Sequence, residues 1–266
     1  MNNLVFGKYI PIKSIIHDLD PRAKIIALFV MIAAVFIPKS WYAYLLLASV
    51  ILIVVFLAHI KLNLILKALK PTIIMMIILF IINCLTVKTG GILLQISNFV
   101  IYKDALFNTL FIVVRLLLMI MLTTVLTATT KPLDLTLGIE SLLSPLKVIG
   151  FPYHEIAMMI SIALRFIPTI IEETMRIMNS QKSRGVDFEE GKLTEKATAI
   201  LSLIIPLFSV AFQRAYELAD AMEARGYDPD KERTRYHTLT FTLKDFIFVL
   251  LANVLLVLMI LSRFYL

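Results

Sequence analysis

The sequence contains a single cysteine, Cys84, among 266 residues. One cysteine cannot form a disulfide within the chain, and because it lies inside an apolar run we interpret it as a small buried hydrophobe. The chain also lacks the pattern G-x-x-x-x-G-K-[ST], which excludes a P-loop nucleotide site. Its four histidines are scattered, and His154-Glu155 is followed by Met158 where a zinc protease has its second histidine. The sequence therefore predicts no nucleotide site and no metal site in this chain.

Charged residues are scarce. They make up 17% of the chain, against 59% hydrophobic residues and a mean hydropathy of +0.88, which indicates that lipid is part of the solvent. The apolar runs lack the two-residue alternation of barrel strands, so we expect helices. The fold class predicted is an all-α polytopic membrane protein with about five transmembrane helices. The stretches long enough to span are residues 23–38, 41–60, 71–87, 105–128 and 244–262.

The charged residues are concentrated in residues 131–243, which hold most of the Asp and Glu and half of the Lys and Arg. The two signs are nearly balanced there, and a nucleic-acid partner is disfavoured because it would need a basic surface. Lysines and arginines in the short loops on the same side favour a cytoplasmic location for this segment and for the N-terminus. We therefore predict a multi-pass protein of the cell membrane with three parts: a membrane domain at 1–130, a cytoplasmic domain at 131–243 and a last transmembrane helix at 244–266.

Within the charged segment, two long amphipathic helices are predicted, at about 154–182 and 194–224. Each has a proline in its interior, Pro168 or Pro206, which is expected to bend the helix into a kinked pair of pieces. Each also carries a polar stripe with steps of four, three and four residues, and the two stripes are offset by 41 positions. The first stripe is Glu172, Arg176, Asn179 and Ser183, and the second is Gln213, Glu217, Asp220 and Ala224.

Both amphipathic helices are expected to end at a glycine, because glycine is best suited to a left-handed C-cap. The residue before the glycine is an arginine each time, in Ser183-Arg184-Gly185 and Ala224-Arg225-Gly226. A cation there is already favoured by the helix dipole, which would explain either arginine alone. A matched pair suggests binding to acidic groups of other proteins, since a guanidinium can bind a carboxylate through two hydrogen bonds. Two similar helix tips indicate two similar binding partners, such as the subunits of a pseudo-symmetric dimer.

These two motifs, together with Asp20-Pro21-Arg22 before the first span, resemble the transmembrane T component of energy-coupling factor (ECF) transporters. In Asp20-Pro21-Arg22 the aspartate is expected to cap a helix whose first position is proline, and Arg22 and Lys24 to anchor it at the anionic leaflet. The first tip motif has serine where the family often has alanine. The resemblance covers nearly the whole chain.

The resemblance implies that this chain is the non-catalytic coupling subunit of an ATP-driven importer of vitamins or other micronutrients. Two ATP-binding subunits would dock on the two arginine tips, and they, not this chain, would hold ATP and magnesium. A substrate-binding S component would contact an apolar surface of the two long helices, although this surface could instead be the underside of the chain's own bundle. The residues expected there are Met158, Met159, Ile160, Leu203, Ile204, Phe208 and Phe212.

Arg115 lies near the middle of the fourth predicted span, where a charge costs about 2.5 to 3.5 kcal/mol on insertion scales. It should therefore face protein or water. The partners that the sequence offers are backbone carbonyls, Asn83 or Asn253. Packing or snorkelling, a contact that holds the bundle, and a place on a substrate path all remain open.

Two other functions are weighed. A membrane-embedded enzyme needs convergent carboxylates or histidines at one membrane depth, and the sequence does not offer such a set. A stand-alone secondary transporter usually has more spans and internal symmetry within the membrane, whereas the repeat here falls in the predicted cytoplasmic segment.

Overall fold

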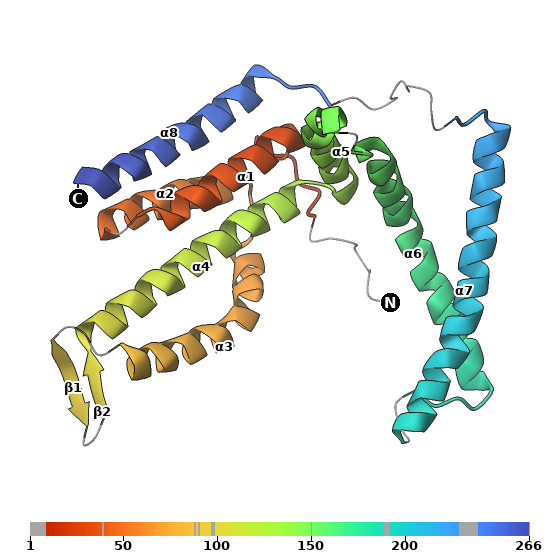
Figure 1. Cartoon of the computed structure of the whole chain (residues 1–266), viewed down its shortest axis with the longest axis horizontal. Helices are drawn as coiled ribbons and strands as arrows, with labels where there is room; N and C mark the ends of the chain where they lie inside the picture. Colours follow the sequence, from red (N-terminus) through yellow and green to blue (C-terminus); the bar gives the residue numbers. More distant parts are fainter. Residues whose placement is uncertain are drawn as a thin grey trace. The chain divides into compact units, whose positions relative to one another are not determined.

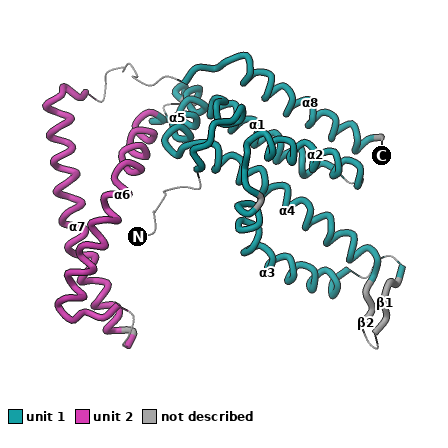
Figure 2. Tube along the Cα trace, turned by 180° about the vertical axis from the view of Figure 1, so that it is seen from behind, with its two compact units in different colours: residues 1–153, 239–266 teal, residues 154–238 magenta. Residues whose placement is uncertain are grey.

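The computed structural model describes residues 9–38, 40–87, 89, 91–96, 99–149, 151–188, 192–228 and 239–265. The chain forms two compact units, which Figure 2 shows in different colours: unit 1 comprises Met1–Tyr153 and Leu239–Leu266, and unit 2 comprises His154–Thr238. The all-helical membrane fold class is confirmed, with helices labelled in Figure 1. The helices are α1 (Pro21–Phe36), α2 (Trp41–Leu57), α3 (Leu62–Thr86), α4 (Lys103–Thr129), α5 (Pro132–Leu143), the 3-10 helix η1 (Ser144–Ile149), α6 (Tyr153–Ser183), α7 (Leu193–Ala224) and α8 (Leu243–Tyr265).

One element was not expected from the sequence. Between α3 and α4 the chain forms an antiparallel hairpin of β1 (Ile92–Ile96) and β2 (Phe99–Tyr102), with Gln95 opposite Val100. The hairpin lies between the predicted spans 71–87 and 105–128.

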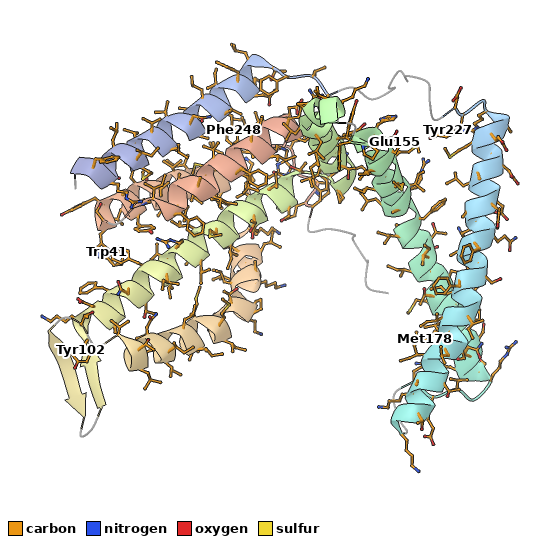
Figure 3. All side chains as sticks on the ribbon, in the orientation of Figure 1. Trp41, Tyr102, Glu155, Met178, Tyr227 and Phe248 are labelled. Atoms are coloured by element: carbon orange, nitrogen blue, oxygen red, sulfur yellow. The ribbon has the colours of Figure 1, made fainter. Side chains whose placement is uncertain are left out.

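In unit 1, α1 packs against α4, α5 and α8, while α2 and α3 pack against α4. The most deeply buried side chains include Tyr44, Leu47, Ile51, Leu118 and Met259. Many leucines, isoleucines and phenylalanines on the outer faces of these helices are exposed, as expected of helices whose outer solvent is lipid. Phe248 on α8 and Trp41 at the start of α2 can be located in Figure 3.

Helix α5 belongs to unit 1, although it lies beyond residue 130, where the sequence analysis drew its boundary. It packs against the start of α1 at Gly138, where an added Cβ would lie 3.1 Å from side-chain atoms of both Pro21 and Ile25. The compact units divide the chain at residues 153 and 238 instead. The division into membrane and cytoplasmic parts remains a prediction.

The helices that are long and apolar enough to cross a membrane are α3, α4, α6, α7 and α8. The third predicted span, 71–87, is the second part of α3, because Pro71 lies inside that helix and does not start it. At 16 and 17 residues, α1 and α2 are shorter than a typical span. The chain is therefore a multi-pass membrane protein. Length and composition alone do not distinguish α6 and α7 from spanning helices, so their cytoplasmic location stays a prediction.

The interior prolines of α6 and α7 do not divide these helices. Both Pro168 and Pro206 lie inside one continuous helix, so neither proline ends a helix, and the bend expected at each proline stays a prediction. A single missing backbone hydrogen bond can be tolerated in a helix of 31 or 32 residues because the turns on either side remain bonded.

Candidate functional site

Helix α6 ends in a Schellman motif that presents Arg184. The Val186 amide donates to the Gln181 carbonyl at 3.1 Å, and the Gly185 amide donates to the Lys182 carbonyl at 3.0 Å. Gly185 has a φ of +87°, the left-handed conformation that the motif requires. The expected glycine C-cap is therefore present. Arg184 is exposed and makes no hydrogen bond or ion pair through its side chain with any other described residue.

Helix α7 ends in the same way, 41 residues later. The Tyr227 amide donates to the Met222 carbonyl at 3.0 Å, and the Gly226 amide donates to the Glu223 carbonyl at 2.8 Å. Gly226 has a φ of +73°, and Arg225 is exposed. Ser183 and Ala224, which precede the two arginines, are exposed as well. The repeated sequence motif thus corresponds to a repeated backbone geometry.

The two tips lie at opposite ends of α7. The chain after Arg184 lies beside the first part of α7, since Val186 and Asp187 line the same pocket as Thr194 and Ser202. Arg225 follows the last residue of the same helix, next to Tyr227, which is labelled in Figure 3. At 1.5 Å per residue, the tips are separated by roughly 30 to 45 Å. That distance is long enough for each tip to bind a separate protein.

Replacing both tip glycines tests the two C-caps. No atom lies within 4 Å of an added Cβ at either position, so the cost of Gly185→Ala or Gly226→Ala comes from the backbone alone. We expect each alanine to destabilise its helix end by about 1 kcal/mol, because alanine disfavours a positive φ. The measurement is amide hydrogen exchange at Val186 and Tyr227, which should become faster. Asparagine, which tolerates this conformation better, should have a smaller effect, and equal effects of alanine and asparagine would argue against the assigned strain.

The apolar surface expected on the long helices is largely uncovered. Five of its seven residues are exposed, whereas Met158 and Leu203 are half-buried. On α7 the exposed stripe is longer than predicted, because Leu201, Ile205 and Tyr216 extend it. Four-residue spacing from Phe208 and Phe212 could have identified Tyr216, which was not among the residues predicted for this surface. The exposed residues of the expected set are Met159, Ile160, Ile204, Phe208 and Phe212.

Helices α6 and α7 cross within unit 2 (Figure 1). Apolar residues of both helices line a cavity of about 260 Å³, among them Phe166 on α6 and Leu218 on α7. Glu173 on α6 lies 3.9 Å from Arg214 on α7, and the same carboxylate lies 3.4 Å from Arg176 on its own helix. The crossing therefore combines a loosely filled apolar contact with one ion pair between the helices.

We expect the Glu173–Arg214 pair to restrict the crossing angle. Arg214→Gln should broaden the distribution of distances between spin labels placed at Asn179 and Gln213, two exposed positions on α6 and α7. Arg176→Gln is the matched control, because it removes a contact to the same carboxylate without linking the two helices. The pair is partly exposed and is worth at most about 1 kcal/mol, so the helices should remain folded. Equal broadening by both variants would contradict this role.

The start of α1 is built as expected at Asp20 and Pro21. The Asp20 carboxylate accepts the Arg22 amide at 2.8 Å, and Pro21 occupies the first helical turn. The proposed lipid anchor at Lys24 is wrong, however, because Lys24 is only 6% exposed. Its ammonium donates to the carbonyls of His17 and Thr129, both at 3.1 Å, so it ties the chain before α1 to the end of α4.

Further hydrogen bonds hold the segment before α1, one of them to the end of α4. The Ile10 amide donates to the Ala128 carbonyl at 3.0 Å. The His17 Nε2 lies 3.1 Å from the Ile10 carbonyl, so it must be the protonated nitrogen, and Nδ1 then accepts the Ser14 hydroxyl at 2.7 Å. Burial lowers the pKa of His17, which keeps this ring neutral at pH 7.

Asp245, in the first turn of α8, joins the starts of α8 and α1 through a bond to Asp20, 225 residues away. Its Oδ1 accepts the backbone amide of Asp20 at 2.7 Å. Its Oδ2 accepts the backbone amide of Thr242 at 2.7 Å and the Thr242 hydroxyl at 2.6 Å. Asp245 is 1% exposed, and the sequence analysis did not single it out. A carboxylate in the first turn of a predicted helix was the available signal.

Arg115 contacts neither of the asparagines considered for it. Its Nη2 donates to the Tyr44 hydroxyl at 3.0 Å, and its guanidinium carbon lies 5.1 Å from the centre of the Phe36 ring. Asn253 instead donates to the Val249 carbonyl of its own helix. Arg115 thus links α4 to α2 and to the end of α1. Of the three roles considered, this geometry fits a contact that holds the bundle.

Comparisons with known proteins bear on the whole chain. Residues 12–236 match the model of the cobalt transport protein family CbiQ. The chain is 44% identical over 245 residues to the energy-coupling factor transporter transmembrane protein EcfT of Bacillus subtilis, an alignment that covers 92% of each chain. It is 41% identical to the protein of the same name in Clostridium kluyveri, over 268 residues that cover 100% of this chain and 98% of that one. These matches extend well beyond the two arginine motifs and agree with the helical membrane fold. The chain therefore belongs to the EcfT family, the transmembrane proteins of energy-coupling factor transporters.

Proposed function

We propose that this chain is the coupling subunit of an energy-coupling factor importer and that Arg184 and Arg225 are its two attachment points for ATP-binding subunits. The observation that carries the proposal is the repeated tip geometry, in which the same Schellman motif holds an exposed arginine at the end of α6 and at the end of α7. The side-chain N–H groups of each arginine form no hydrogen bond with another described residue. Each arginine can therefore bind an acidic groove on another protein.

The two partners are proposed to be a pair of similar ATPases, which bind ATP and magnesium and perform the catalysis. Closure of that pair would move the two attachment points relative to each other. Because the points lie at opposite ends of α7 and the α6–α7 crossing is loosely packed, such a movement can be transmitted as a change in the crossing of the helices.

The exposed apolar stripe of α7 is proposed to contact the substrate-binding S component. Phe208 and Phe212 are 60% and 61% exposed, and their stacked rings offer a smooth surface without directional bonds. Such a surface lets a partner slide, and the methionines of α6 can adapt to several packings. The transported compound, a vitamin or another micronutrient, would be chosen by the S component.

The proposed topology places the N-terminus, α6 and α7 in or at the cytoplasm, as the distribution of Lys and Arg predicts. The competing functions receive less support. Of the four buried charged residues in the described part of the chain, Asp20, Lys24 and Asp245 are engaged with the backbone or with Thr242, and Glu140 also has an interaction partner, so they do not form a free set of catalytic or proton-carrying groups.

Copurification tests the proposal as a whole. The tagged chain, solubilised from its native membrane, should retain two ATP-binding proteins and one small membrane protein, identified by mass spectrometry. Recovery of the chain with no ATP-binding protein, under conditions that preserve its fold, would contradict the assignment.

A further inference from the structure

A groove of about 420 Å³ lies in unit 1, where α1, α2, α4 and α8 meet the segment before α1. Its walls are almost entirely apolar and include Met31, Ile51, Val125, Phe248 and Leu251. Within a bilayer such a groove is filled by something apolar, because an empty one would deprive its lining of dispersion contacts and water would find few polar partners.

The polar groups of the groove are gathered at one end. Among the described residues, the basic ones that line the groove are Lys24 and Lys244, and Thr129 lines it as well. These residues share one end of the bundle, since Lys24 is in the first turn of α1, Thr129 ends α4, and Lys244 is in the first turn of α8. Direct bonds between the Lys24 ammonium and the Thr129 carbonyl, and between Asp245 and Asp20, hold these helix ends together.

Both lysines can still donate hydrogen bonds to a ligand. Two of the three N–H groups of the Lys24 ammonium are used by carbonyls. Lys244 is exposed and has no side-chain partner among the described residues. The nearby Asp245 is not among the residues that line the groove. Its carboxylate already accepts three hydrogen bonds within unit 1.

We propose that this groove binds one anionic phospholipid, with an acyl chain between the four helices and the phosphate at the exposed Lys244. A lipid of this class combines the two chemistries that the groove presents, an apolar wall and a cationic end. A protein helix fits less well, because a helix about 10 Å wide fills roughly 400 Å³ with each turn, so the groove would hold about one turn. The proposal requires only that unit 1 is in a membrane and is independent of the two arginine tips.

The test is native mass spectrometry of the delipidated full-length chain, titrated with dioleoylphosphatidylglycerol or dioleoylphosphatidylcholine. We expect one molecule of phosphatidylglycerol to bind at least about fivefold more tightly than phosphatidylcholine, and Lys244→Gln to reduce this preference to near unity. The matched control is Arg263→Gln, which removes an exposed cation at the other end of α8 and should leave the preference unchanged.

A second pair of variants tests the acyl-chain part of the groove. Leu250 and Leu251 are adjacent on α8 and are 49% and 57% exposed, but only Leu251 lines the groove. Leu251→Trp should reduce binding of phosphatidylglycerol at least about tenfold by filling the groove, whereas Leu250→Trp should not. Equal binding of the two lipids, equal loss in the two tryptophan variants, or no lipid adduct at all would each overturn the proposal. The copurification of ATP-binding subunits is a separate readout, so either proposal can fail alone.

Discussion

The double variant Arg184→Glu, Arg225→Glu should abolish copurification of the ATP-binding subunits while leaving the chain inserted and folded. Each reversal replaces a cation with an anion facing an acidic groove, which we expect to weaken that contact about a hundredfold or more. Both arginines are exposed, and their side chains form no hydrogen bond or ion pair with the described residues, so we expect the fold not to depend on them. A single reversal should weaken the complex without abolishing it, because two attachment points act together.

Two further variants separate the attachment role from a general charge effect. Lys182→Glu makes the same charge change two residues before Arg184, at an exposed position outside the motif, and should leave the complex nearly intact. Replacement of both arginines by lysine keeps the charge but loses the planar fork, and should weaken binding to an intermediate degree. If Lys182→Glu were as damaging as Arg184→Glu, net charge and not the tip geometry would explain the result.

Asp245→Asn should produce the largest loss of stability among single substitutions in unit 1. The carboxylate accepts three hydrogen bonds at 2.6 to 2.7 Å in a site that is 1% exposed. An amide removes the negative charge and turns one acceptor into a donor that faces other donors. We expect the free energy of unfolding to fall by about 3 kcal/mol. The measurement is unfolding by sodium dodecyl sulfate in mixed micelles, followed by the fluorescence of the single tryptophan, Trp41.

Asp104→Asn is the matched control for Asp245. Asp104 also lies in the first turn of a helix, α4, but it forms no hydrogen bond or ion pair with another described residue. Its replacement should change the unfolding free energy by less than about 0.5 kcal/mol. Comparable losses in the two variants would mean that the first-turn charge, and not the bond to Asp20, stabilises the bundle.

Features that depend on neighbouring residues were predictable from the sequence. The glycine C-caps and the Asp20 cap require only a few consecutive residues, so Gly185, Gly226 and Asp20 adopt the expected conformations. The polar stripes of α6 and α7 are exposed as their periodicity predicts.

Features that depend on the packing of distant segments were not predictable. Arg115 meets Tyr44, 71 residues away, because of how α4 and α2 align, and no periodicity in either helix specifies that alignment. The same limit applies to the bond between Asp245 and Asp20. For Lys24, hydropathy suggested the membrane surface, whereas the carbonyls at the end of α4 provide a buried site for its ammonium.

The ends of α6 and α7 are proposed as attachment points for two ATP-binding subunits in the cytoplasm. Lys182 and Glu223 are exposed, lie 41 positions apart and each precede a tip arginine by two residues, so they offer equivalent positions for a reporter. Each is replaced by cysteine in a Cys84→Ser chain, and crosslinking is carried out from the cytoplasmic side of native membrane vesicles. We predict that each cysteine crosslinks to an ATP-binding subunit. Labelling of either cysteine only from the external side, or the absence of any crosslink to such a subunit from both, would contradict the account.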